Sequence, residues 1–406
     1  MNLPVKTMLL KFPLISLFAL SICVFANQPG TSAAVTPSIK NTKNSGQTPA
    51  VSFNDNDYRL SKLTIEEKIG QLLMPRLRWQ IKGVDSSTVD LMKTVPVGGI
   101  ALYRDNVENI PQLQAFTKDL QALARLPLFI AIDEEGGRVS RIGRLFSGPT
   151  PPAYDIGSRG DFTAAYAAAC TIGRRLTHLG INMNFAPIAD IWSNPANKAI
   201  GNRAFGKTPD ITAEMVAVTV RGFASQGVLA VVKHFPGHGD TYEDSHYHPA
   251  VYPHKREHFN KVEAIPFVKA IEAGTAGIMT GHIVTPAFKE SRLLMSWKAP
   301  FVKAGALPVT FSDFWLQDVL RKDMGFDGLI ISDALDMRAL TDHFTSEQII
   351  LGTFLAGADI LLVPPNPKEA FKIMIDAYNT GLFDEERVNR SVRRVLKAKE
   401  RWLIRE

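Results

Sequence analysis

Residues 212–234, TAEMVAVTVRGFASQGVLAVVKH, contain the pattern from which the fold can be predicted. Apolar residues recur at helical spacing from Thr212 to Gln226. Gly227 follows, a residue that ends a helix at little cost because it adopts left-handed backbone angles. The continuous apolar run Ala230–His234 is typical of a strand buried on both faces of a parallel sheet. The segment therefore predicts one helix–strand unit of an α/β fold.

The same alternation continues in both directions along the chain. The apolar runs predict strands at Gln71–Pro75, Gly99–Tyr103, Leu128–Asp133, Ile181–Ala186, Ala230–His234, Gly277–His282, Gly328–Asp333 and Asp359–Val363. The intervening periodic segments predict helices that include Ile110–Ala124, Phe162–Leu179, Thr212–Gln226, Phe259–Ala273, Asp313–Met324 and Ser346–Ala356. Glycines lie near the ends of several of these helices, at Gly180, Gly227, Gly274, Gly325 and Gly357.

Eight strand–helix units in one α/β domain predict a single (β/α)8 barrel of the TIM type. An open, doubly wound sheet is the alternative. That fold would need a glycine-rich phosphate loop after the first strand, where the sequence has Met74-Pro75-Arg76-Leu77. We expect the barrel to occupy residues 58–406.

The segment before residue 58 has a different composition. Two lysines precede an apolar run from Phe12 to Ala26, a pattern that predicts a signal peptide over residues 1–26 and export to the periplasm or the medium. A retained membrane anchor and a lipoprotein modified at Cys23 are alternatives. Residues 27–57 are rich in Ser, Thr, Asn, Pro and Gly, and they predict a flexible linker. Cleavage would leave Cys170 without a disulfide partner in the mature chain.

The overall composition, with 45% hydrophobic and 21% charged residues, is that of a soluble globular protein. The net charge of +6 comes from scattered lysines and arginines, with a small cluster at Arg387–Lys399. No basic stripe with aromatic residues and no nucleic-acid motif accompanies them, so we expect no nucleic-acid partner. We expect no stable membrane span after signal removal, and no feature specifies an oligomer.

Polar residues gather where the predicted strands end. They are Asp133-Glu134-Glu135, Asp190, Lys233-His234, His282 and Ser332-Asp333. The carboxyl ends of barrel strands open on one face, and that face carries the chemistry in barrels of this type. These side chains are therefore expected to converge in one pocket.

The longest of these polar segments is residues 233–246, KHFPGHGDTYEDSH. Its proline and glycines oppose regular structure and predict a loop. Asp244 lies two residues before His246, where a carboxylate can orient the imidazole and stabilise its protonated form. This pair predicts a proton shuttle that works near neutral pH.

Three further motifs supply groups that suit a sugar. In residues 330–337, IISDALDM, Asp333 stands at the tip of a strand, where a carboxylate can attack an anomeric carbon; Asp336 is expected to cap a helix. Residues 133–141, DEEGGRVSR, offer carboxylates and arginines for vicinal hydroxyls, although the adjacent Glu134 and Glu135 should point different ways. Residues 199–206, AIGNRAFG, add the donor fork of an arginine.

These four motifs, in this order, resemble glycoside hydrolase family 3, and in particular its β-N-acetylhexosaminidase branch, from about residue 60 onwards. The resemblance implies a retaining hydrolase that releases terminal β-linked N-acetylglucosamine from peptidoglycan fragments or chitooligosaccharides, without a metal or organic cofactor. It implies Asp333 as nucleophile, His246 as acid/base and Asp244 as its partner. It assigns sugar binding to Asp133, Arg141, Arg203, Lys233 and His234.

Two features depart from that branch. Many members carry a second acidic residue directly after the nucleophile, where this chain has Ala334. Members that recycle the cell wall commonly lack a signal peptide, so its presence favours substrates met outside the cytoplasm.

Three alternative functions remain. The histidines at 234, 238, 246, 248, 254 and 258 suggest a metal-dependent hydrolase, although Pro236 and Gly237 oppose a helical ligand pair. A β-N-acetylglucosaminide phosphorylase would use the same histidine and accept phosphate in place of water. A sugar-binding barrel without turnover is the alternative outside catalysis.

Overall fold

A computed structural model of the chain describes residues 59–77, 83–242, 250–287 and 307–404. The chain divides into two units, Met1–Val51 and Ser52–Glu406, and the described residues all belong to the second. The predicted signal peptide and linker lie outside the described residues, as do Asp244 and His246. Among the helices that are described, none has the length and apolar character needed to cross a membrane.

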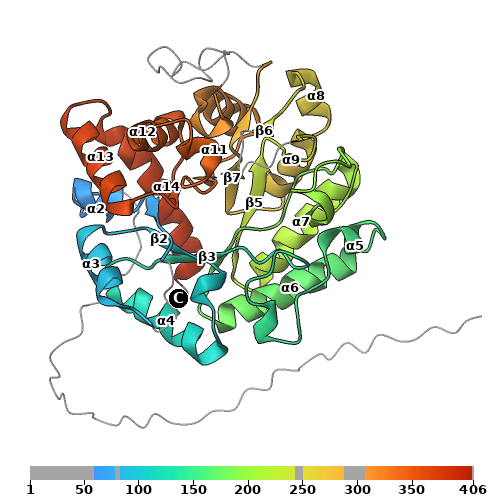
Figure 1. The fold of residues 1–406 in the computed structure, drawn as a ribbon, viewed down its shortest axis with the longest axis horizontal. Helices are drawn as coiled ribbons and strands as arrows, with labels where there is room; N and C mark the ends of the chain where they lie inside the picture. Colours follow the sequence, from blue (N-terminus) through green and yellow to red (C-terminus); the bar gives the residue numbers. More distant parts are fainter. Residues whose placement is uncertain (1–58, 78–82, 243–249, 288–306, 405–406) are drawn as a thin grey trace, which may run out of the picture. The chain divides into compact units, whose positions relative to one another are not determined.

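A curled parallel sheet forms the centre of this unit (Figure 1). Six strands are hydrogen-bonded side by side in the order β2 (Gly99–Leu102), β3 (Phe129–Ile132), β4 (Met183–Asn184), β5 (Leu229–Phe235), β7 (Gly277–Thr280) and β9 (Leu329–Ser332). A parallel pair, β1 (Leu73–Met74) and β10 (Leu361–Leu362), is bridged to the two edges of this sheet. The bridges are Arg76↔Ala101 on the β2 side and Ile331↔Ile360 on the β9 side.

Each of the eight predicted strands is present, with most ends shorter than predicted. All residues of these eight strands are buried, which explains why their sequences are continuous apolar runs and not alternating ones. A further short parallel pair, β6 (Ala250–Val251) and β8 (Ile283–Val284), was not predicted.

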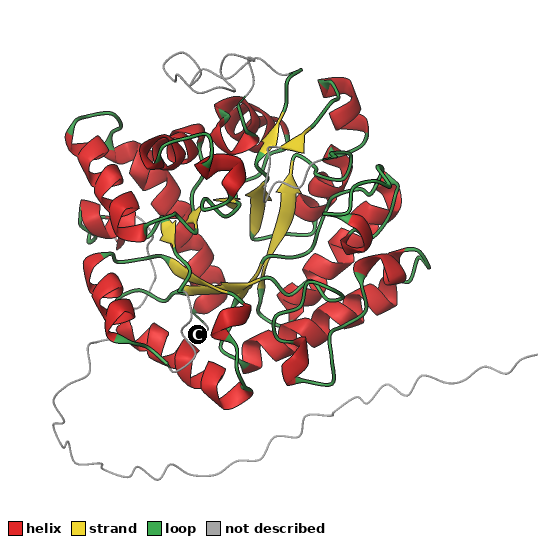
Figure 2. Ribbon diagram, viewed as in Figure 1, coloured by secondary structure: helices red, strands yellow, loops and turns green. Residues whose placement is uncertain are grey.

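Helices surround the strands (Figure 2). They are α2 (Ile65–Gly70), α3 (Ser86–Thr94), α4 (Ile110–Leu123), α5 (Ala153–Gly157), α6 (Phe162–His178), α7 (Pro209–Ser225), α8 (Arg256–Lys261), α9 (Ala264–Glu272), η6 (Phe314–Asp323), α11 (Arg338–Thr341), α12 (Ser346–Ala356), α13 (Pro367–Asn379) and α14 (Glu385–Leu403). The five glycines expected near helix ends all have positive φ, between +67° and +121°. The left-handed backbone expected there is thus confirmed.

The predicted helix Phe259–Ala273 is wrong in one respect, because the structure divides it into α8 and α9. Pro266 lies in the first turn of α9. A proline at that place lacks an N–H group and clashes with the carbonyl four residues earlier, so a continuous helix through Val262 is disfavoured. Proline is tolerated where a new helix begins.

The opposite end of the sheet is covered by α14. Lys399 of this helix is fully buried; its Nζ donates a hydrogen bond to Gln71 Oε1 at 2.6 Å and lies 5.2 Å from the centre of the Phe129 ring. Gln71 precedes β1 and Phe129 begins β3, so this lysine contacts the amino-terminal ends of the strands.

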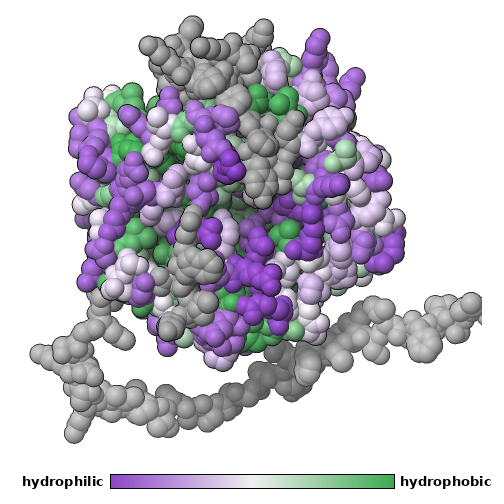
Figure 3. All heavy atoms as spheres, in the orientation of Figure 1, coloured by the Kyte–Doolittle hydropathy of each residue, from purple (hydrophilic) through white to green (hydrophobic). Residues whose placement is uncertain are grey.

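Hydrophilic residues predominate on the face shown in Figure 3, with hydrophobic patches between them.

Candidate active site

A cavity of about 270 Å³ lies at the carboxyl ends of the strands. Six of the residues expected to form the site line it: Asp133, Arg141, Arg203, Lys233, His234 and Asp333. Parallel strands of a curled sheet place their carboxyl ends around one point, so residues two hundred positions apart in sequence become neighbours. The remaining two expected residues, Asp244 and His246, lie outside the described residues.

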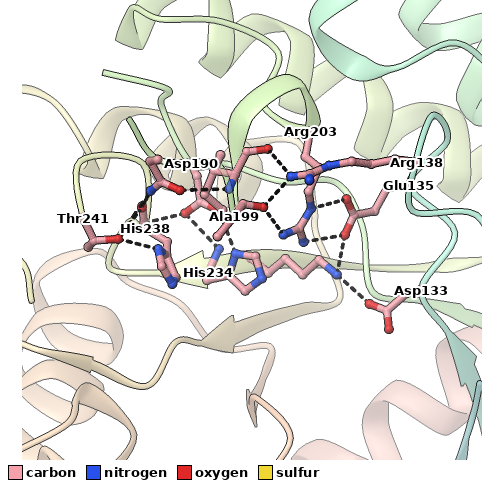
Figure 4. A network of polar contacts seen from close by, with 12 residues as sticks. Asp133, Glu135, Arg138, Asp190, Ala199, Arg203, His234, His238 and Thr241 are labelled. Carbon is pink, nitrogen blue, oxygen red and sulfur yellow. Dashed lines mark hydrogen bonds and ion pairs between the residues drawn. The ribbon is translucent and has the colours of Figure 1, made fainter. Parts of the chain in front are cut away.

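One wall of the cavity is a network of ion pairs (Figure 4). Lys233 Nζ lies 2.6 Å from Asp133 Oδ1 and 2.7 Å from Glu135 Oε1. Arg203 binds Glu135 through two parallel hydrogen bonds, from Nε and Nη2, each of 2.9 Å. Arg141 Nη2 lies 3.8 Å from the second oxygen of Asp133. Lys233 belongs to β5 and Arg203 to the short helix η3 (Gly201–Arg203), while Asp133 and Glu135 lie in the loop that follows β3.

The charges in this wall are fixed by their mutual contacts. Burial by itself would raise the pKa of Glu135, but the neighbouring Arg203 and Lys233 hold it well below its usual range. Burial would lower the pKa of Lys233, but Asp133 and Glu135 raise it. The pKa of Arg203 is raised in the same way, mainly by Glu135 against the effect of burial. Glu135, Lys233 and Arg203 therefore stay charged across the neutral pH range and present oriented donors and acceptors.

A buried carboxylate orients the next pair of residues. Asp190, which is fully buried, contacts His234 Nδ1 through Oδ2 at 2.7 Å, while its Oδ1 accepts from the backbone N–H of His238 at 2.7 Å. Burial by itself would raise the pKa of Asp190, but its electrostatic and hydrogen-bond interactions with His234 and His238 outweigh that effect and lower it. Burial, with a smaller electrostatic contribution from the neighbouring His234, lowers the pKa of His238 to about 4. His238 is thus neutral at pH 7, and its Nδ1 lies 2.7 Å from Thr241 Oγ1.

Asp333 follows the last residue of β9 and reaches the cavity from another side. Its backbone N–H donates to the Thr280 carbonyl at 3.0 Å, and its Oδ1 accepts from the N–H of Ala334 at 2.7 Å. His282 supports the same turn, because its Nε2 lies 2.9 Å from the Ala334 carbonyl oxygen. The parallel pairing of β7 with β9 therefore fixes where this carboxylate stands.

The wall formed by β1, β2 and β10 was not anticipated. Arg76 and Tyr103 line it together with Leu362, and Arg76 Nη2 lies 3.2 Å from Asp105 Oδ2. Burial raises the pKa of Tyr103, and the nearby carboxylates of Asp133, Asp336 and Asp333 add to that effect. In the sequence, Arg76 belongs to the segment Met74–Leu77, which lacks the glycines of a phosphate loop. No pattern in the sequence marks it as a site residue.

Two expectations about acidic residues can now be compared with the structure. Asp336 lines the cavity, and the N-cap of the next helix, α11, is Met337, so the capping interpretation of Asp336 was wrong. The expectation that Glu134 and Glu135 point different ways is confirmed. Glu134 turns into the protein and accepts from Ser140 Oγ at 2.5 Å and from the N–H of Arg141 at 2.6 Å.

No group of three or more His, Cys, Asp or Glu side chains is arranged to hold a metal ion within the part of the chain that the structure describes. His234 and His238, which suggested a ligand pair, both contact Asp190, one through its ring and the other through its backbone.

Comparison with known proteins identifies the family. Residues 64–398 match the family model described as "Glycosyl hydrolase family 3 N terminal domain". The chain belongs to glycosyl hydrolase family 3. The resemblance found in the four sequence motifs is thereby confirmed.

Relatives within this family have informative names. The chain is 35% identical to Beta-hexosaminidase A of Pseudoalteromonas piscicida over 370 aligned residues. The aligned region covers 83% of this chain and 61% of that protein. It is 34% identical over 281 residues to a Beta-hexosaminidase of Chromobacterium violaceum, covering 68% and 73% of the two chains. A solved structure, a glycoside hydrolase family 3 β-N-acetylglucosaminidase from Paenibacillus sp. str. FPU-7, is 36% identical with a TM-score of 0.77, over 84% of this chain and 63% of that one. This chain thus spans less than two thirds of the length of the first and third of these proteins.

Proposed function

We propose that the chain is a retaining β-N-acetylhexosaminidase that hydrolyses terminal β-linked N-acetylglucosamine. One observation carries the proposal: Asp333 shares a cavity with the charged wall of Asp133, Glu135, Lys233 and Arg203. A carboxylate that faces such a set of fixed donors and acceptors suits attack on a sugar whose hydroxyls are held opposite. The names of the relatives support the choice of an N-acetylated sugar.

The proposed mechanism has two steps. Asp333 attacks the anomeric carbon while His246 donates a proton to the leaving oxygen, which gives a covalent glycosyl-enzyme of inverted configuration. His246 then takes a proton from water, the water displaces Asp333, and the β configuration returns. Asp244 is proposed to orient the imidazole of His246 and to stabilise its protonated form. No metal or organic cofactor enters these steps.

The charged wall is proposed to bind the sugar hydroxyls. The carboxylate of Asp133 accepts hydrogen bonds, while Lys233, Arg141 and Arg203 donate them. The contact with Asp190 engages Nδ1 of His234, so its Nε2 is the nitrogen proposed to face the sugar. Because these groups are already paired and ordered, little side-chain entropy is lost when the substrate binds.

We further propose that the sheet closes into a complete (β/α)8 barrel. Hydrogen bonds from Ala101 N–H to the Pro75 carbonyl (2.9 Å) and from Ser332 N–H to the Ile360 carbonyl (3.1 Å) support closure at both edges. The cavity lining also supports it, since residues at or next to the ends of all eight strands contribute: Arg76, Tyr103, Asp133, Phe185, Lys233, Met279, Asp333 and Leu362.

The proposed site of action lies outside the cytoplasm, on peptidoglycan fragments or chitooligosaccharides. The apolar run from Phe12 to Ala26 and the two lysines before it support export. Mass spectrometry of the protein recovered from the periplasm or the medium should give an amino terminus after Ala26. An intact amino terminus on a membrane-bound protein would contradict this proposal.

The function is tested with the β-N-acetylglucosaminide and the β-glucoside of one chromogenic phenol. We expect release from the N-acetylglucosaminide alone, and we expect Asp333→Ala to abolish it. Asp342→Ala serves as the control, because this exposed carboxylate pairs with Arg338 one helical turn away and does not line the cavity. Turnover by Asp333→Ala would contradict the assignment of the nucleophile. A rate that depends on added phosphate would identify a phosphorylase instead.

A further inference from the structure

The described chain is firmly held where it approaches His246 in the sequence. Thr241 is buried, and its Oγ1 lies 2.7 Å from Nδ1 of His238 (Figure 4). The Thr241 carbonyl accepts a hydrogen bond from Asn194 Nδ2 at 3.1 Å. Because the backbone N–H of His238 is bound by Asp190, this side of the chain is anchored to the buried network around that carboxylate.

The chain is held again soon after His246. Strand β6 pairs with β8, and the N–H of Tyr252 donates to the Val284 carbonyl at 2.9 Å. The hydroxyl group of Tyr252 donates to Glu263 Oε2 at 2.7 Å, and both of these side chains are buried. Residues 243–249 themselves lie outside the described part of the chain. The described residues on either side of them are thus fixed by separate sets of contacts.

One ion pair joins the two sides directly. Oδ2 of Asp240 contacts Nε2 of His254, which bridges the chain across residues 241–253. The other oxygen of Asp240 accepts from Ser193 Oγ at 2.9 Å, and the ring of His254 stacks on that of His258 with centres 3.8 Å apart. The two paired side chains are only 25% and 32% exposed, so water screens them less than a fully exposed pair. A bridge of this kind restricts the conformations open to the chain that it encloses.

The bridge continues into the packing of α8 and α9. His258 Nε2 lies 3.4 Å from Glu263 Oε1, and the other oxygen of Glu263 accepts from Tyr252. The two ends of the enclosed chain therefore share one continuous set of polar contacts. Such precision matters for a general acid, because a displacement of about 1 Å can cost about a hundredfold in rate.

We infer that Asp240 and His254 are positioning residues, whose ion pair fixes the two ends of the enclosed segment and so sets where His246 delivers its proton. The inference rests on the proposed function, in which His246 is the acid/base, and deepens it. Neither Asp240 nor His254 lines the cavity of about 270 Å³, so neither is assigned a contact with the substrate. Their contribution is expected in the step that needs a proton.

The test measures kcat/KM on two aryl N-acetylglucosaminides, one of a strongly acidic phenol that departs without a proton and one of a weakly acidic phenol that needs one. Asp240→Asn keeps the size of the side chain and removes its charge, and His254→Gln removes the ring. We expect each variant to lower kcat/KM by about tenfold or more on the weakly acidic phenol and by less than about threefold on the other. The rate on the acidic phenol also reports whether the variant is folded.

Asp323→Asn is the matched control. This carboxylate pairs at 2.6 Å with Arg256 of α8, the helix that also carries His258, but it lies outside the bridge. Both rates should change by less than about twofold in this variant, because the pair that it removes is largely exposed.

Double-mutant cycles separate positioning from a general structural effect. In a His246→Ala background, Asp240→Asn should change both rates by less than about twofold, because no acid is left to position. The combined variant Asp240→Asn/His254→Gln should lose no more than either single variant, since the two residues act as one pair.

Equal losses on the two substrates in Asp240→Asn, or an undiminished loss in the His246→Ala background, would overturn the inference while leaving the proposed hydrolase intact. A different result would remove both. If His246→Ala lowered the two rates equally, the assignment of the acid would fail, and the positioning role of Asp240 and His254 would fail with it.

Discussion

Glu135 and Arg203 form a bidentate ion pair in which both hydrogen bonds are 2.9 Å long. The same carboxylate lies 2.7 Å from Lys233 Nζ, and the side chain of Glu135 is only 6% exposed. One buried carboxylate thus neutralises part of two cations that belong to different elements, Arg203 of η3 and Lys233 of β5. The position of Lys233 in the cavity depends on this arrangement, because Glu135 and Asp133 hold its Nζ from two sides.

Replacing Glu135 with Ala should therefore weaken both fold and function. The change leaves two buried cations with only Asp133 between them, and breaking a buried pair in this way costs about 3–5 kcal/mol. We expect the free energy of unfolding, measured in urea, to fall by that amount, and the KM for the chromogenic N-acetylglucosaminide to rise.

A matched control uses the exposed pair of Lys372 and Asp376 on α13, one helical turn apart. Asp376→Ala should cost less than about 1 kcal/mol, because water screens exposed pairs. A similar loss in both variants would show that the network around Glu135 has no special weight in stability.

Replacing His246 with Ala should give losses that depend on the leaving group. An aryl oxygen of low pKa departs without a proton, whereas an alcohol oxygen of a second sugar requires one. We expect a far larger drop in kcat/KM on chitobiose than on an activated aryl N-acetylglucosaminide. Equal drops on the two substrates would argue against His246 as the acid.

Lys399 predicts a particular pH dependence of stability. Burial lowers the pKa of this lysine from its ordinary value of 10.5 to about 7 in the folded protein. Between these two values the unfolded chain binds more protons than the folded one, so stability rises with pH. Below about pH 7 both states are protonated, and the burial cost of the charged amine is fully present. Over the range from pH 7 to about 10 the slope contributed by this one group approaches about 1.4 kcal/mol per pH unit.

The measurement is urea unfolding between pH 6 and pH 9.5 for the native sequence and for Lys399→Met. Methionine fills a similar volume without a charge, so the variant should show a shallower rise in stability with pH. Lys372→Met, at an exposed position, provides the comparison for changes in general charge. Parallel pH profiles for the native chain and Lys399→Met would refute this account of the buried amine.

Much of the site was determined by the sequence itself. A strand buried on both faces must be apolar throughout, so polar residues mark the point where it ends. Asp133, Lys233 and Asp333 were located in this way, and parallel strands bring such ends together whatever their separation along the chain. Helix ends could be predicted equally well, because Gly180 and Gly357 adopt positive φ angles that other residues adopt only with strain.

The tertiary structure decided which polar residues meet. Glu134 and Glu135 are neighbours in sequence and carry the same carboxylate. Glu134 accepts a hydrogen bond from the backbone of the loop at Arg141, whereas Glu135 faces Arg203 and Lys233 and belongs to the charged wall of the cavity. Arg76 belongs to a short segment without any pattern, and its place in the cavity lining depends on contacts with Asp105 and Tyr103, which follow β2. Local sequence determines burial and backbone angles, since both depend on nearby residues. The pairing of charges depends on contacts across the sheet, which only the folded chain establishes.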